Sequence, residues 1–280
     1  MNLKYEILAA AVALMLPTTL SGQAATPVGR PSTPVAGQST ARPGGFREPD
    51  PRNFDDHTGY VSLFDGQDLK GWDGDPSVWS VQNGAITGVT TLQHRAHTYL
   101  VYRGLQAKDF DLKLEIKAVG GGTGIQYRSR TGTPWRRPDK GLPAPNLNWM
   151  MTGPQADFWS PNPPRAAVYT GQFYVENSPL GIVAWRGEVV QIEPGQAPRL
   201  VGTIGDRKAL NGYVNVNDWN QYMIMARGGT FIQILNGQLM SLAVDDDAHD
   251  VNNRSGMIGI EIEGAPAVIS VRNIWIKKFN

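Results

Sequence analysis

Apolar and polar residues alternate with a period of two along much of the chain after residue 54. In residues 257–264, three isoleucines fall on one side of an expected strand, and Glu261 and Glu263 fall on the other. The same alternation runs through residues 110–116 and 219–226, and helical periodicity is nearly absent. Roughly a dozen segments of this kind, separated by turn signals, predict an all-β fold.

Two short turns strengthen this prediction. Asn83-Gly84 and Asn236-Gly237 each separate two strand-like runs, and this dipeptide supplies the positive φ angles of a type I′ hairpin. Consecutive hairpins favour antiparallel sheets over a βαβ arrangement. We therefore expect residues 54–280 to form one sandwich of two antiparallel sheets.

The segment before residue 54 has a different composition. Residues 1–25 contain Lys4, an apolar run from 7 to 17 and small residues at 21–25, the layout of a secretory signal peptide. Residues 26–53 are rich in proline and nearly free of large apolar residues, which predicts a disordered linker. The chain has no cysteine, so it lacks the thiol of a lipoprotein anchor. We expect a periplasmic or secreted protein with no stable membrane anchor.

The charge balance and the missing motifs narrow the classes of molecule that the protein is expected to bind. A net charge of +1 leaves no basic stripe, so we expect no nucleic-acid partner. The four histidines form no His-x-x-x-His pair, and the chain has no Gly-x-Ser-x-Gly, Walker or dinucleotide-binding motif. The expected ligand is a small molecule or an oligosaccharide. The oligomeric state is left open.

Polar side chains recur on the outward side of several expected strands. Gln126 and Arg128 alternate with apolar neighbours, Asp157 follows a similar run, and Glu261 and Glu263 form a third pair. Exposed sheet faces and turn caps offer an ordinary explanation for the first three residues. Two adjacent carboxylates, however, repel each other unless a cation lies between them. Arg128 could be that cation, or a divalent metal ion such as Ca²⁺, Mg²⁺ or Mn²⁺.

Several motifs occur in an order that resembles a known family. They are residues 60–72 (YVSLFDGQDLKGW), 79–88 (WSVQNGAITG), 108–112 (KDFDL), 124–129 (GIQYRS), 155–157 (QAD) and 271–276 (VRNIWI). This set resembles the 3-keto-disaccharide hydrolase domain over about residues 59–279. The resemblance implies a jelly-roll sandwich, concanavalin- or glucanase-like, with a concave sugar-binding face. In one strand the family commonly has Gln and His where this chain has Glu261 and Glu263.

The resemblance also implies a reaction. Family members act on glycosides whose C3 hydroxyl has been oxidised to a ketone, which acidifies the C2 hydrogen. A base removes this proton, the group on C1 is eliminated, and water then adds. We expect Asp157 as the base, Arg128 at the ketone oxygen and Glu261 or Glu263 as the acid. The residues expected to bind the substrate are Gln126, Gln155, Tyr169, Tyr174, Glu176 and Trp135.

Two alternatives remain open at this point. A carbohydrate-binding module of the same fold would keep the aromatic residues and tolerate loss of the carboxylates. An ordinary glycoside hydrolase would use Glu261 and Glu263 as its carboxylate pair.

Overall fold

The computed structural model describes residues 50–136, 146–160 and 169–279. The expected signal peptide, and all of the expected linker up to residue 49, lie outside the described residues. Asn53–Asn280 forms one compact unit, which contains all the described strands. Among the described residues, no helix has the length and apolar character needed to cross a membrane.

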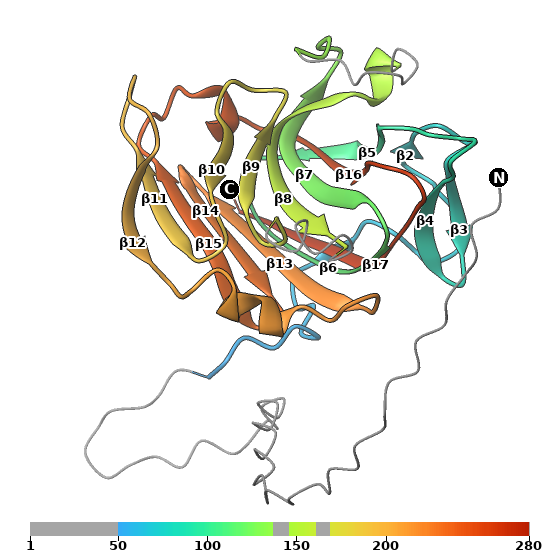
Figure 1. Ribbon diagram of the computed structural model, residues 1–280, viewed down its shortest axis with the longest axis horizontal. Coiled ribbons are helices and arrows are strands. Elements are labelled where there is room, and N and C mark those ends of the chain that lie inside the picture. Colours follow the sequence, from blue (N-terminus) through green and yellow to red (C-terminus); the bar gives the residue numbers. More distant parts are fainter. Residues whose placement is uncertain (1–49, 137–145, 161–168, 280) are drawn as a thin grey trace, which may run out of the picture. The chain divides into compact units, whose positions relative to one another are not determined.

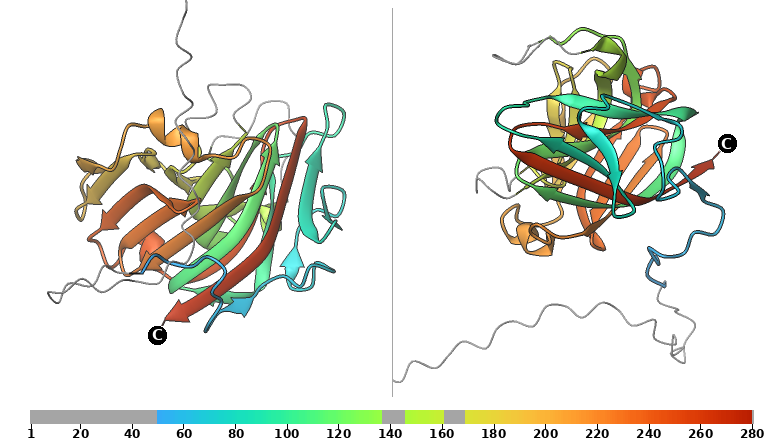
Figure 2. Two further views of the ribbon diagram at one scale, coloured as in Figure 1. Left: turned by 90° about the horizontal axis from the view of Figure 1, so that it is seen from below. Right: turned by 90° about the vertical axis from the view of Figure 1, so that its right-hand side faces the viewer.

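The unit Asn53–Asn280 is a sandwich of two β-sheets (Figures 1 and 2). The ten-stranded sheet has the order β12-β11-β15-β14-β13-β6-β17-β4-β3, with β1 paired to β17. The seven-stranded sheet has the order β10-β9-β8-β7-β16-β5-β2. Neighbouring strands run antiparallel except β11 and β15, which run parallel. The predicted all-β, two-sheet sandwich is confirmed.

The bounds of the elements are as follows. The ten-stranded sheet consists of β1 (Val61–Ser62), β3 (Trp79–Gln82), β4 (Ala85–Thr90), β6 (Asp109–Val119), β11 (Glu188–Ile192), β12 (Arg199–Thr203), β13 (Asn220–Arg227), β14 (Thr230–Leu235), β15 (Gln238–Asp245) and β17 (Ala267–Phe279). The seven-stranded sheet consists of β2 (Trp72–Asp73), β5 (Thr98–Ala107), β7 (Gly122–Thr131), β8 (Met151–Trp159), β9 (Phe173–Glu176), β10 (Gly181–Ala184) and β16 (Gly256–Ile262). The described helices are short 3-10 helices at Leu147–Trp149, Ala209–Tyr213 and Val251–Asn253.

The core lies between the two sheets, where the alternating pattern places apolar side chains. The three isoleucines of β16, Ile258, Ile260 and Ile262, are fully buried there. Ile125 and Tyr127 of β7 join the same cluster. Burial of this apolar surface is the main stabilising contribution in a domain without disulfides.

Both predicted hairpin turns have the expected backbone. Asn83 and Gly84 have φ angles of 51° and 73° between β3 and β4, and Asn236 and Gly237 have 50° and 80° between β14 and β15. Positive φ at both central positions is the signature of a type I′ turn.

The register of the seven-stranded sheet gathers polar residues on its outer face, the face turned away from the core. Asp157 of β8 lies opposite Gly124 of β7, and Gln155 lies opposite Gln126. On the other edge of β7, β16 carries Glu261, which pairs with Tyr99 of β5. Residues far apart in the sequence thus meet in one strip across the sheet.

Candidate functional site

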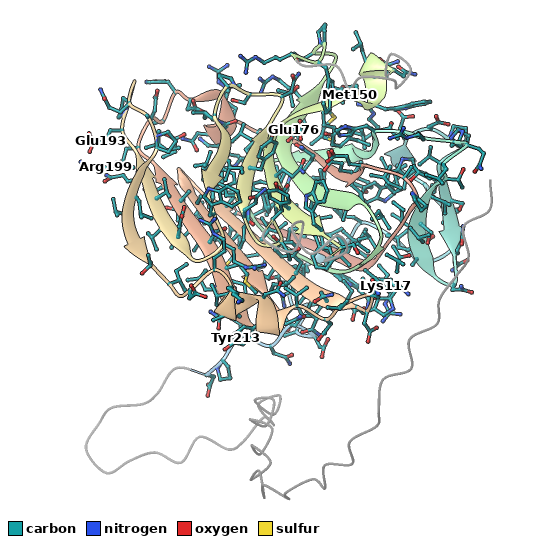
Figure 3. All side chains as sticks on the ribbon, viewed as in Figure 1. Lys117, Met150, Glu176, Glu193, Arg199 and Tyr213 are labelled. Carbon is teal, nitrogen blue, oxygen red and sulfur yellow. The ribbon has the colours of Figure 1, made fainter. Side chains whose placement is uncertain are left out.

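A pocket of about 280 Å³ opens on the outer face of the seven-stranded sheet. Seven residues expected to bind or react with substrate line it: Trp135, Gln155, Asp157, Tyr169, Tyr174, Glu176 and Glu263. Four further residues line it: His97, Trp159, Gln172 and Ile182. Figure 3 labels Glu176, which ends β9.

Two glycines of β7 make room for the floor of this pocket. A Cβ atom on Gly122 would lie 2.5 Å from Cε2 of Trp159, and one on Gly124 would lie 2.5 Å from Cδ of Gln155. Side chains of β8 therefore lie across β7, which only residues without a side chain permit. The pocket is recessed because these two positions are glycine.

Gln155 joins two buried carboxyl groups. Its Nε2 donates to Oδ1 of Asp157 and to Oε2 of Glu261, at 2.7 Å in each case. Its Oε1 accepts from Nε2 of Gln126, whose own Oε1 accepts from the Ser129 hydroxyl. Gln126 is thus bonded to Gln155 rather than lining the pocket.

The other oxygen of each carboxyl group is also bonded. Oδ2 of Asp157 accepts from the Gln172 amide. Oε1 of Glu261 accepts from the Tyr99 hydroxyl at 2.8 Å and lies 2.7 Å from Nε2 of His97. Glu261 is only 1% exposed and acts on the pocket through the lining residues His97 and Gln155.

Burial shifts the protonation of the acidic groups. Burial, and next the charge of Glu261, raise the pKa of Asp157 well above its usual range, against the opposing effect of the two glutamine amides. The same two causes raise the pKa of Glu176 to about 8. Burial and the neighbouring carboxylates also raise the pKa of Tyr174, so its hydroxyl stays protonated at neutral pH. Glu176 is therefore mostly protonated at neutral pH, where a solvent-exposed glutamate would be ionised.

Arg128 does not join this pocket, and the expectation that it faces Glu261 and Glu263 is wrong. Its backbone has a φ of 50°, and the pairing of β7 with both neighbouring strands shifts register around it. The guanidinium donates to the carbonyl oxygens of Lys108 and Gly228 and to the Asp109 carboxylate. It also lies over the Phe231 ring, 5.1 Å from the centroid. The bulge turns this side chain from the outer face towards the ten-stranded sheet.

Comparison with known families adds to this geometry. The profile of the 3-keto-alpha-glucoside-1,2-lyase-like domain matches residues 59–277, nearly all of the sandwich. The chain belongs to this family. The resemblance seen in the sequence motifs is therefore confirmed. No curated protein matches the sequence.

Two solved structures share the fold of this lyase-like domain at low sequence identity, and a third is a weaker match. A protein from Parabacteroides distasonis ATCC 8503, provisionally assigned as a glycosyl hydrolase, has a TM-score of 0.50 at 16% identity, covering 79% of this chain and 99% of that one. A Bacillus subtilis protein of unknown function with a galectin-like fold has a TM-score of 0.50 at 12% identity, covering 78% and 94%. The carbohydrate-binding module CBM66 from Bacillus subtilis has a TM-score of 0.44 at 15% identity, covering 74% and 96%.

In this lyase-like domain, the imidazole of His97 lies close to the carboxylates of Glu261 and Glu263. His97 immediately precedes β5, and its ring packs edge-on against Trp135 with centroids 4.3 Å apart. One ligand atom each from His97, Glu261 and Glu263 lies within 4.8 Å of the others. One nitrogen and two carboxylate oxygens form a donor set suited to a divalent ion, and the imidazole favours Mn²⁺ over Ca²⁺ or Mg²⁺.

Replacing Gly124 by alanine tests the recessed floor. The new Cβ would overlap the Gln155 side chain, so the amide must leave its position between Asp157 and Glu261. We expect the free energy of unfolding to fall by about 1–3 kcal/mol. Thermal unfolding measures this change. Gly212→Ala is the matched control, since no atom lies within 4 Å of its Cβ position; equal melting temperatures for the two variants would contradict the packing described.

Proposed function

We propose that this protein cleaves 3-keto-glycosides by removal of the C2 proton, elimination of the group on C1 and addition of water. Family membership supports a carbohydrate-related function. The observation that carries the specific proposal is the acidic pocket, in which Asp157, Glu176 and Glu263 line one cavity beside His97. We further propose that the protein is secreted or periplasmic, on the composition of residues 1–25.

The pocket suits an elimination, in which one group removes the C2 proton and another donates a proton to the departing oxygen. Asp157 has a raised pKa, which makes its ionised form a stronger base for the C2 hydrogen than a solvated carboxylate. Glu176 holds a proton at neutral pH and can donate it to the departing oxygen. Tyr174 and Gln155 supply further hydrogen-bonding groups for substrate hydroxyls.

A developing enolate also needs an electrophile at the ketone oxygen. Arg128 is held elsewhere, so we propose the group formed by His97, Glu261 and Glu263 in its place. These three residues would hold a divalent ion, which when bound would polarise the C3 carbonyl. Without the ion, the 2.7 Å contact between Oε1 of Glu261 and Nε2 of His97 holds the imidazole beside the two carboxylates.

The proposal is tested with a 3-keto-glucoside and its unoxidised parent carrying the same leaving group. Release of the leaving group from the keto compound alone supports elimination. Cleavage of the parent at a similar rate would instead identify an ordinary glycoside hydrolase. Binding of either compound without turnover, with and without added Mn²⁺, would favour a carbohydrate-binding module.

The pH dependence should report on Glu176. Because its pKa is raised to about 8, this carboxyl is protonated below that value and ionised above it. A proton donor is active only when protonated, so at pH values where Asp157 is already ionised kcat/KM should fall about tenfold per pH unit as the pH rises above 8. Glu176→Gln cannot donate at any pH and should lack this decline. A decline above pH 8 that persists unchanged in Glu176→Gln would assign it to another group.

A further inference from the structure

Trp135 forms part of the pocket wall beside His97. Its indole lines the pocket and packs edge-on against the imidazole, with ring centroids 4.3 Å apart. It also packs against a small buried apolar cluster, separate from the main core, that consists of Tyr99, Val101, Met150 and Met151. The indole thus contacts both this cluster and the imidazole, and its position sets the shape of the pocket at this wall.

One side chain holds the backbone on both sides of Trp135. Asn177 directly follows β9, and its Oδ1 accepts from the N–H of Arg136 at 2.7 Å. Its Nδ2 donates to the Pro134 carbonyl at 3.0 Å and to the Thr152 hydroxyl of β8 at 3.1 Å. A single amide therefore joins the segment that carries the indole to β8 and to the end of β9.

The backbone at Asn177 accounts for the type of residue found there. Its φ of 54° lies in the left-handed region, which asparagine and glycine enter more readily than most residues. Glycine would make the same turn, but of the two only asparagine supplies a side-chain amide. In this turn the N–H of Asn177 donates to Oε1 of Glu176 at 3.0 Å. The residue thus lies between the proposed proton donor and the segment that carries Trp135.

We propose that Asn177 is a positioning residue for substrate binding, which holds Trp135 against His97 and so fixes this wall of the pocket. Asn177 does not itself line the pocket, so it acts through the indole rather than by contact with the substrate. The inference rests on the proposed function, because it takes this pocket to be the place where the glycoside binds. A wall contacts the bound substrate and the transition state equally, which lowers KM and leaves kcat unchanged.

Asn177→Gly removes the amide and keeps the turn, because glycine adopts a positive φ without strain. On a 3-keto-glucoside, we expect KM to rise about 5- to 10-fold and kcat to change less than about 2-fold. Rates are measured at a temperature at which thermal unfolding shows the variant to be folded. An unchanged KM, or a loss confined to kcat, would overturn the proposal.

Asn217→Gly is the matched control. Asn217 also has a φ of 54°, but it is exposed, so this variant makes the same chemical change away from the pocket. Its kinetic constants should equal those of wild type. An equal rise of KM in both variants would mean that the effect comes from glycine itself and not from the amide of Asn177.

A double variant shows whether the amide acts through the indole. Trp135→Ala alone should raise KM by a factor similar to that of Asn177→Gly. The double variant Asn177→Gly/Trp135→Ala should be no worse than Trp135→Ala, because both changes remove one wall. Losses that multiply would mean that the amide acts by another route, and would overturn the positioning role.

Two measurements without turnover separate this inference from the reaction. The N–H of Arg136 donates to Asn177, so hydrogen exchange of residues 133–136 should be about 10-fold faster in Asn177→Gly and unchanged in Asn217→Gly. Calorimetry with the unoxidised parent glucoside should show that Asn177→Gly binds it about 5- to 10-fold more weakly than wild type.

These outcomes distinguish the two proposals. Faster exchange and weaker glucoside binding in Asn177→Gly, without turnover of any keto-glycoside by wild type, would refute the proposed reaction and keep the role of Asn177. Turnover by wild type with unchanged exchange or unchanged glucoside binding in Asn177→Gly would keep the reaction and overturn that role. If wild type showed neither turnover nor binding, both proposals would be wrong.

Discussion

Replacing Arg128 by methionine is expected to lower the free energy of unfolding by about 3–5 kcal/mol while leaving turnover per folded molecule unchanged. Arg128 is 2% exposed, and its guanidinium donates to three backbone carbonyl groups as well as to the Asp109 carboxylate. Methionine has similar reach but no donors, so these acceptors would lose the hydrogen bonds that the guanidinium supplies. Urea unfolding measures the loss, and activity is scaled to the folded fraction.

Arg130 supplies the matched control on the same strand. It is exposed at the end of β7, two residues further along, and Arg130→Met should change stability by less than about 0.5 kcal/mol. If Arg128→Met were as stable as wild type and inactive, the catalytic role first expected for Arg128 would be restored, and its assignment to the interior would be wrong.

The contrast between Arg128 and Glu261 shows what a period of two can predict. On β16 the alternation holds to the end, and the sequence correctly separates Ile260 and Ile262 from Glu261. On β7 one residue with a positive φ interrupts the alternation after Tyr127, and Arg128 leaves the expected face. A bulge at a residue other than glycine leaves no local signal in composition, because tertiary contacts of the guanidinium stabilise it.

His97 was missed for a different reason. The spacing of His97, Tyr99 and Val101 is itself alternating and was available in the sequence. Its importance depends on the pairing of β5 with β16, which brings Glu261 opposite Tyr99 across more than half the chain. Local patterns predict that a strand has a polar face, but not which strand lies next to it.

Gly122 and Gly124 are a sequence signal for the recess in the seven-stranded sheet. Two glycines alternating on one face of a strand leave space that neighbouring side chains must fill. Here Trp159 and Gln155 fill it. The pattern predicts a depression in the sheet, whereas the identity of the residues lying in it follows only from the register of β8.

Asp157→Asn is expected to reduce turnover of a 3-keto-glycoside by about 10²-fold or more without lowering stability. An amide cannot accept the C2 proton, and removal of a positioned base has an effect of this size. The carboxyl is buried and its raised pKa means that ionisation is unfavourable in the folded protein. Stability contributed by the protonated form is lost as the pH rises towards that pKa, and a neutral amide avoids this loss. The melting temperature at neutral pH should therefore be equal to or higher than that of wild type.

Comparison with Glu263→Gln shows which side of the pocket carries the base. Asp55 is an exposed carboxylate outside the pocket, so Asp55→Asn controls for the loss of a negative charge. If Asp157→Asn keeps wild-type rates while Glu263→Gln is inactive, the base lies on the side of β16. If Asp157→Asn unfolds at a lower temperature, the carboxylate is needed for its hydrogen bonds to Gln155 and Gln172. Only loss of turnover with retained stability assigns proton abstraction to Asp157. In Asp157→Asn, Gln155 can still donate to the amide oxygen and Gln172 can turn its own amide to accept from the new NH₂ group, but the side chain can no longer accept the C2 proton.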